Sequence, residues 1–141
     1  MEPVPSAEDG HEWEDYFLPK VCYPMPDIIE FPRTCPVKVK DELRAAFTLF
    51  WLHPAACAGR IRVALEYLMD HFSIPRQKTN TKGKCYIHKL GDRLDDFAEN
   101  NSTMQNELMS LKWLGNTGSH EQTITKDELL TAFEIFEHAL N

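Results

Sequence analysis

Apolar residues recur at helical spacing through most of the chain after residue 35. The strongest pattern lies in residues 54–72, where apolar side chains occupy the i, i+3, i+4 and i+7 positions of an amphipathic helix. These positions are held by Ile61, Ala64, Leu65, Leu68, Met69 and Phe72. Pro54 suits the first turn of a helix, and Ser73-Ile74-Pro75 ends the pattern. The segment therefore predicts a helix with one continuous buried face.

Four further segments show shorter patterns of the same kind. Their apolar positions are Leu43, Ala46, Phe47 and Phe50; Ile87, Leu90, Leu94 and Phe97; Met104, Leu108 and Leu111; and Leu129, Ala132, Phe133, Phe136 and Leu140. Ser102 with Gln105, and Thr125 with Glu128, have the spacing of capping boxes at the starts of the last two helices.

No segment alternates with period two for long enough to predict a strand, and residues 76–86 predict a polar loop. We therefore expect residues 34–141 to form an all-α antiparallel bundle of about five helices. The core we expect consists of Leu65, Leu68, Phe72, Leu94, Phe97, Leu111, Phe133 and Phe136.

Residues 1–33 contain six prolines, which predict an extended arm rather than a helix or a central strand. Within residues 1–30 there are eight acidic residues and one basic residue, so this stretch accounts for the formal charge of −7 of the whole chain. The remainder is neutral, so the acidic balance does not exclude a polyanionic partner for the body. We expect part of the arm to pack on the body, because it carries Trp13, Tyr16, Phe17 and Tyr23.

Length and composition exclude several classes of protein. A chain of 141 residues buries enough surface to fold without a metal or a disulfide, and its apolar runs are far shorter than a membrane span. The acidic N-terminal stretch lacks the apolar segment of a secretory signal. Glycine-rich phosphate loops, Gly-x-Ser-x-Gly elbows and His-Glu-x-x-His motifs are absent from the sequence. We expect a cytoplasmic protein with no cofactor, no metal and no membrane contact.

Two features near neighbouring helices could carry chemistry. Arg62 and Glu66 lie one helical turn apart, either as a simple ion pair or as a pair at the edge of a groove. The segment 112–120 contains Lys112, Asn116 and His120. Gly115 in this segment has the character of a left-handed helix C-cap. If the helix instead continues through Asn116, then Asn116 and His120 share one face, and His120 is either a general acid or base or a structural residue.

A run of cations forms the third feature. Arg76, Lys78, Lys82, Lys84 and Lys89 follow one another with no acidic residue between them. Such a run is either a solvated loop or a contact to a nucleic-acid phosphate backbone. We further expect Arg62, Glu66, Asn116 and His120 to converge in one groove with Lys112 near its rim. His88 and the other histidines have no partner at metal-ligand spacing.

The stretches PAACAGRIRVALEYLMDHF and LKWLGNTGSH, with the lead-in IIEFPRTCPVKVKDELRAAF, resemble a bacterial domain-of-unknown-function family over roughly residues 28–141. That family is similar to the HEPN superfamily of helical domains. The resemblance implies a homodimer that works near nucleic acid, with a protein partner in a phage-defence system. Many HEPN members are metal-independent ribonucleases with an Arg placed several residues before a catalytic His.

Against that pattern His120 and Asn116 match, but positions 113–115 are Trp, Leu and Gly, so the family's Arg is missing. Lys112 is the nearest cation in sequence, and Arg62 could supply the charge in space. Two functions therefore stay open. One is a dimeric binding or scaffolding module for RNA or other nucleic acid. The other is a metal-independent ribonuclease with His120 as general acid or base, helped by Asn116, Arg62, Glu66 and Lys112.

Overall fold

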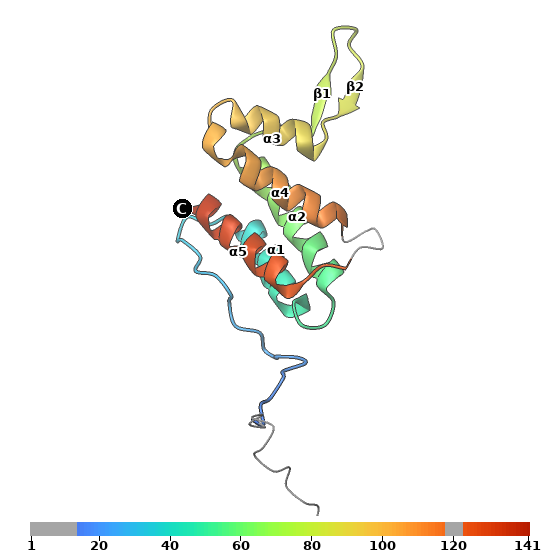
Figure 1. Cartoon of the computed structure of the whole chain (residues 1–141). Coiled ribbons are helices and arrows are strands. Elements are labelled where there is room, and N and C mark those ends of the chain that lie inside the picture. Colours follow the sequence, from blue (N-terminus) through green and yellow to red (C-terminus); the bar gives the residue numbers. More distant parts are fainter. Residues whose placement is uncertain (1–13, 118–122) are drawn as a thin grey trace, which may run out of the picture.

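The computed structural model describes residues 14–117 and 123–141, and this part of the chain is mainly helical, as the sequence predicts (Figure 1). The elements in chain order are α1 (Val37–Leu49), α2 (Pro54–His71), β1 (Gln77–Thr79), β2 (Cys85–Ile87), α3 (Leu90–Ala98), the 3-10 turn η2 (Ser102–Met104), α4 (Gln105–Thr117) and α5 (Lys126–Leu140). Within the described ranges, every helix is too short or too polar to cross a membrane.

Helix α2 is the centre of the fold and contacts α1, α3, α4 and α5. Its apolar face is buried as predicted, with Ile61, Leu65 and Leu68 at 1% exposure or less. Seven of the eight predicted core residues are buried. The exception is Phe72, which is 43% exposed because it follows the last residue of α2 and packs on the surface against Phe97, with ring centroids 4.9 Å apart.

The prediction of a polar loop over residues 76–86 is wrong, as is the expectation that the chain has no strand. β1 and β2 form an antiparallel hairpin in which Gln77 faces Ile87 and Thr79 faces Cys85. Gly83 has a φ of 79° in the turn, a conformation that glycine adopts without strain. Each strand has three residues and neither has a buried face, so no alternating pattern was there to detect. Ile87, predicted in a helix, lies in β2 and is exposed.

The two predicted capping boxes have different outcomes. At the start of α5, Thr125 and Glu128 form the reciprocal pair of hydrogen bonds that defines a capping box. Ser102 does not cap α4, because it opens the 3-10 turn η2 and α4 begins only at Gln105. The spacing alone does not distinguish a helix start from a short turn that precedes it.

The arm packs on the body, but through residues other than the expected aromatics. Tyr16, Phe17 and Tyr23 are more than four-fifths exposed, whereas Ile29 is buried. Trp13 lies outside the described residues. Figure 1 shows the arm leaving the side of the helical body near the C-terminal end of α5 and extending in the direction away from the hairpin.

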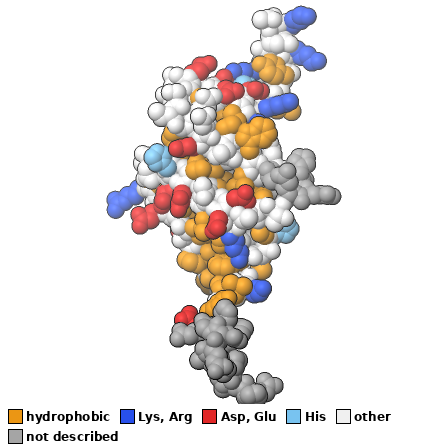
Figure 2. Space-filling model, in the orientation of Figure 1, with side chains coloured by type: hydrophobic (Ala, Val, Ile, Leu, Met, Phe, Trp, Pro, Cys, Tyr) orange, Lys and Arg blue, Asp and Glu red, His pale blue; other side chains and the backbone are white. Residues whose placement is uncertain are grey.

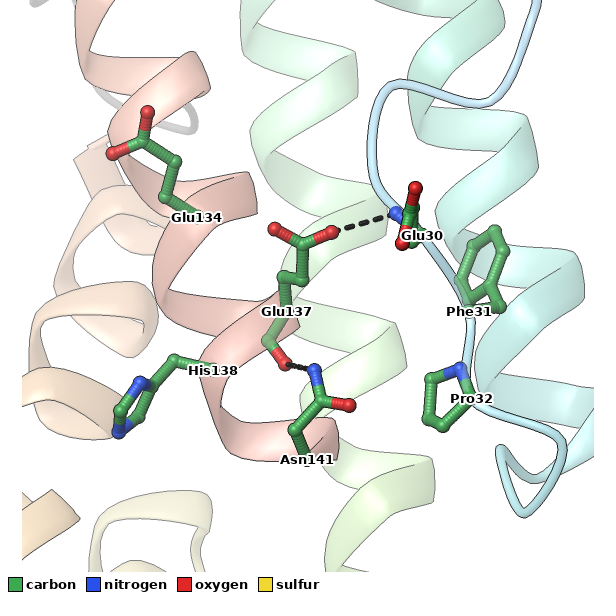
Figure 3. A pocket seen from close by; sticks show the side chains of 7 residues that line it. All are labelled: Glu30, Phe31, Pro32, Glu134, Glu137, His138 and Asn141. Atoms are coloured by element: carbon green, nitrogen blue, oxygen red, sulfur yellow. Dashed lines mark hydrogen bonds between the residues drawn. The ribbon is translucent and has the colours of Figure 1, made fainter.

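Three contacts hold the arm near residues 27–31. Both carboxylate oxygens of Asp27 accept hydrogen bonds from Arg44 of α1, each at 2.9 Å. The backbone N–H of Glu30 donates to a side-chain oxygen of Glu137 on α5, at 2.6 Å (Figure 3). The arm therefore bridges the first and last helices, although the two are far apart in sequence.

Candidate functional site: a cationic cleft between two helices and the hairpin

A cleft of about 460 Å³ lies where α2, α4 and the start of α3 meet the base of the hairpin. We call it the cationic cleft, because four cations and a single carboxylate line it. The lining residues are Arg62, Glu66, Arg76, Ile87, His88, Lys89, Leu90, Gly91, Lys112 and Asn116. The described part of the sequence-predicted groove, namely Arg62, Glu66, Lys112 and Asn116, is thus in one place. His120 lies outside the described residues.

Arg62 and Asn116 join α2 to the last turn of α4. Arg62 Nη1 donates a hydrogen bond to Asn116 Oδ1. Helix α4 continues through Asn116 to Thr117, so the interpretation of Gly115 as a left-handed C-cap is wrong. Gly115 instead permits close packing, because a Cβ at this position would lie 2.6 Å from the Cβ of Arg62.

Glu66 fixes the base of the hairpin rather than pairing with Arg62. Its carboxylate lies 3.5 Å from Arg76 and 3.7 Å from Arg93, and no ion pair joins it to Arg62 in the described part of the chain. Arg93 is almost fully buried and donates to Asp70 at 2.6 Å and to the carbonyl of Ile74 at 2.7 Å. These contacts tie α2, α3 and the start of the hairpin together.

Lys112 reaches across from α4 to the first turn of α3. Its Nζ lies 2.8 Å from the point where a side chain on Gly91 would begin, so the missing side chain leaves space for the ammonium group. The residue before α3, Lys89, makes no side-chain capping bond to the helix. The positive end of the α3 dipole and Lys112 lie at the same edge of the cleft, with Asp92 in the first turn of α3 offsetting part of their charge.

His88 and Lys78 share one carboxylate at the side of the cationic cleft. His88 Nε2 lies 2.8 Å from Asp96 Oδ2, and Lys78 Nζ lies 2.6 Å from the same oxygen. The His88 side chain is only 6% exposed. The hydrogen bond from Lys78, followed by that from His88, holds the pKa of the Asp96 carboxyl below its usual range, against the opposing effect of burial. Asp96 is therefore a carboxylate at neutral pH.

The five cations of the predicted run do not form one patch. Arg76 and Lys89 line the cationic cleft, whereas Lys78 points to Asp96 on α3. Lys82 and Lys84 belong to the exposed turn of the hairpin, where both backbone N–H groups donate to Asn80 Oδ1. Figure 2 shows Lys and Arg side chains at the tip of this projection.

Sequence reasoning missed His88, Gly91 and Asp96. His88 and Asp96 are eight residues apart, a spacing that matches no helical or metal-ligand rule. They meet because the hairpin returns the chain to α3, and the hairpin itself left no sequence pattern. The one available signal was His88 next to Lys89, directly before an amphipathic helix.

A second pocket lies between the arm and α5, and its acidic side chains do not converge on one point where they could bind a metal ion. It is lined by Glu30, Glu134, Glu137, His138 and other residues. In Figure 3 the side chains of Glu134 and His138 point away from the contact between Glu30 and Glu137. No group of three or more metal-ligating side chains occurs among residues 14–117 and 123–141.

Residues 44–141 match the model of a protein family described as "Domain of unknown function (DUF4145)". The chain belongs to this family. The DUF4145 match begins inside α1 and runs to residue 141, so it includes every residue of the cationic cleft but neither the arm nor the first part of the lead-in, residues 28–43. No curated protein and no solved structure matches the chain.

Proposed function

We propose that this DUF4145 domain is a nucleic-acid-binding module that holds the phosphate backbone in the cationic cleft. The observation that carries the proposal is the convergence of Arg62, Lys112, Lys89 and Arg76 on one cleft whose lining holds a single carboxylate, that of Glu66. Arg76 is paired with Asp70, at 2.7 Å, and more loosely with Glu66, at 3.5 Å, so the net positive charge of the cleft comes from the other three cations.

The position of the hairpin supports a polymeric ligand rather than a single phosphate. The hairpin is rooted at the cleft, and its turn carries Lys82 and Lys84 into solvent. A small anion would be held by the cleft alone, whereas a polyanion would contact both the cleft and the turn. Binding through phosphates is independent of base sequence and weakens steeply with salt, because counterions are released.

The test is fluorescence anisotropy with labelled oligouridine, oligodeoxythymidine and a DNA duplex. The double variant Lys89→Gln, Lys112→Gln is expected to weaken binding at least about tenfold and to flatten the salt dependence. The matched control is Lys20→Gln, Arg33→Gln, which removes the same charge at exposed positions of the arm. Equal losses in both double variants would mean that only net charge matters, and no binding to any probe would reject the proposal.

A second candidate function is a metal-independent ribonuclease that uses His120. It is favoured by the contact between Arg62 and Asn116, because this brings an arginine to a residue four positions before His120. RNA cleavage with EDTA present, measured together with the melting temperature of a His120→Ala variant, tests it. Lost cleavage with unchanged melting supports catalysis, and lost stability without any cleavage supports a structural role.

The proposal also includes a homodimer. It further includes a protein partner in a defence system, as the family resemblance implies. The relation to the HEPN superfamily also stays a proposal. It is supported by the order of the two quoted motifs and by the mainly helical fold.

A further inference from the structure

The hairpin presents one apolar strand with an open edge. β2 is exposed along its whole length, with Tyr86 at 45% and Ile87 at 75% exposure. Figure 1 shows the hairpin standing clear of the helical body. A two-stranded hairpin is barely stable by itself, and an uncovered strand edge is a ready template for another strand. The edge of β2 is therefore a candidate interaction surface.

The hydrogen bonds of the hairpin show which backbone groups of β2 face outward. The N–H of His88 donates to the carbonyl of Arg76 at 2.8 Å, so these two residues form a hydrogen-bonded pair. Along an antiparallel ladder such pairs alternate with pairs that exchange no hydrogen bond. The next pair, Ile87 with Gln77, is therefore not hydrogen-bonded, and neither is Cys85 with its partner two positions further along. The N–H and C=O groups of Ile87 and Cys85 consequently point away from β1.

These outward groups are placed so that β2 can pair with a second copy of itself. Two β2 strands that run antiparallel about a two-fold axis at Tyr86 bring Cys85 of each copy opposite Ile87 of the other. Each of these pairs then exchanges N–H···O=C hydrogen bonds in both directions, because both of its residues present their backbone groups outward. The edge is thus self-complementary, as a two-fold interface requires.

The side chains on this edge also suit self-pairing. In this register Tyr86 lies opposite its own copy at a non-hydrogen-bonded position, where side chains are closest and aromatic pairs are favourable. Cys85 and Ile87 form apolar cross-strand pairs on the other face of the sheet. The outer edge of β1 is less suitable, because self-pairing about its centre would place Lys78 opposite Lys78.

We propose that two copies of this chain associate through the edge of β2 and form a continuous antiparallel sheet with the order β1-β2-β2-β1. This inference rests on the homodimer that the proposed function includes, and it does not depend on nucleic-acid binding. Because the two β2 strands run in opposite directions, the turn of each hairpin lies beside the base of the other. Backbone hydrogen bonds and apolar pairs form the contact, so salt should not weaken it, in contrast to binding of phosphates.

The first test is light scattering of the full-length protein and two proline variants over a range of micromolar concentrations. Cys85→Pro removes an outward N–H from β2 but no hydrogen bond between β1 and β2. Thr79→Pro is the matched control, because Thr79 is the partner of Cys85 and its N–H points outward from β1. The dissociation constant of the dimer is expected to rise at least about tenfold in Cys85→Pro and to stay unchanged in Thr79→Pro. Equal effects of the two prolines would overturn the inference, as would an unmutated protein with the single-chain mass at every concentration.

A disulfide tests the register, and it decides the matter even where a proline variant fails to fold. The background carries Cys22→Ser and Cys85→Ser, which remove the exposed cysteines of the described residues. In this background Tyr86→Cys is expected to give a covalent dimer on oxidation, because residues opposite each other in a non-hydrogen-bonded pair lie within disulfide range. Lys84→Cys is the control, since the same register holds its two copies about 14 Å apart.

The cross-linked fraction is read from non-reducing gels, and nucleic-acid binding of the same samples is measured separately. Equal cross-linking of Tyr86→Cys and Lys84→Cys overturns the register. A dimer that persists in Cys85→Pro, without cross-linking of Tyr86→Cys, overturns this inference and leaves both the homodimer and the binding proposal standing. If Trp113→Ala abolishes the dimer while Cys85→Pro does not, the contact belongs to α4 instead.

Discussion

A Cβ placed on Gly115 would lie 2.6 Å from the Cβ of Arg62 and 3.3 Å from the carbonyl oxygen of Ala58. The backbone of α4 at Gly115 therefore packs directly against Arg62 and Ala58 of α2 beside the cationic cleft. A side chain at position 115 would force the two helices apart. This contact sets how closely Arg62 and Asn116 approach each other.

Gly115→Ala is accordingly expected to lower the free energy of unfolding by about 1–3 kcal/mol, as overpacking does in other cores. The measurement is urea denaturation. The matched control is Gly59→Ala in α2, where a Cβ would meet no atom within 4 Å. That variant is expected to gain up to about 1 kcal/mol, because alanine is the better helix former. Similar effects at the two positions would contradict the close approach of α2 and α4.

The packing of α2 gives a second prediction. Leu68 is 1% exposed, whereas Phe72 on the same predicted stripe is 43% exposed. Leu68→Ala is expected to cost about 2–5 kcal/mol of unfolding free energy. Phe72→Ala is expected to cost less, although it removes a larger side chain. Thermal or urea unfolding of both variants measures these two costs. A loss of unfolding free energy below about 0.5 kcal/mol in Leu68→Ala would show that this position is not enclosed.

Leu68 and Phe72 also show how much of the fold can be predicted from the sequence. The period of 3.6 residues found the buried face of α2, because every fully enclosed side chain there obeys it. Phe72 fits the period but follows the last turn, and the exact end of a helix is set by tertiary contacts. The groove was expected at Arg62 and Glu66 because they flank a buried stripe, and at Asn116 because the helix was expected to break there. The residues do meet in one cleft, but α4 continues through Asn116. His88 and Asp96 could not be paired in advance, because a hairpin without a buried face brings them together.

The anchor between the arm and α1 gives a pH dependence. The hydrogen bonds from Arg44 hold the pKa of Asp27 below its usual range, with partial burial acting in the opposite direction. A carboxyl whose pKa is lower in the folded state stabilises the fold above its unfolded pKa, about 3.9, and this contribution is lost as the pH falls through the lowered value. The stability difference between unmutated protein and Asp27→Asn should therefore be constant near neutrality and vanish in acid.

Urea denaturation over a series of pH values measures this difference. Asp15→Asn removes the same charge in the exposed part of the arm and serves as the control. A difference between the unmutated protein and Asp27→Asn that grows in acid would contradict the anchor.

The hairpin turn gives a prediction about salt. If Lys82 and Lys84 contact phosphates, then replacing both by Gln should reduce the slope of log K against log salt by about 2. Stability should hardly change, because both side chains lie in an exposed turn. The slope is measured by titration of labelled oligouridine at several salt concentrations. A slope equal to that of the unmutated protein would confine the binding site to the cleft.

Association is a separate prediction. Apolar side chains such as Trp113 and Leu130 are exposed on α4 and α5, at 59% and 38%. We expect a two-fold homodimer, since a closed two-fold assembly is the commonest form of self-association. Light scattering at micromolar concentration should then give twice the chain mass of 16.3 kDa. A particle of the single-chain mass would reject the dimer.

If the cationic cleft binds nucleic acid as proposed, the length of the hairpin sets a distance along the bound strand. From the Gln77–Ile87 pair to the Thr79–Cys85 pair, the two residue steps rise about 7 Å at about 3.4 Å per residue. One strand of duplex DNA places a phosphate about every 3.4 Å along its axis. If a nucleic acid lies along the hairpin, this rise corresponds to about two phosphates between the cleft and the start of the turn. A hairpin longer or shorter by one residue pair would change the footprint of the domain by about one nucleotide per residue, without disturbing the helices beneath it.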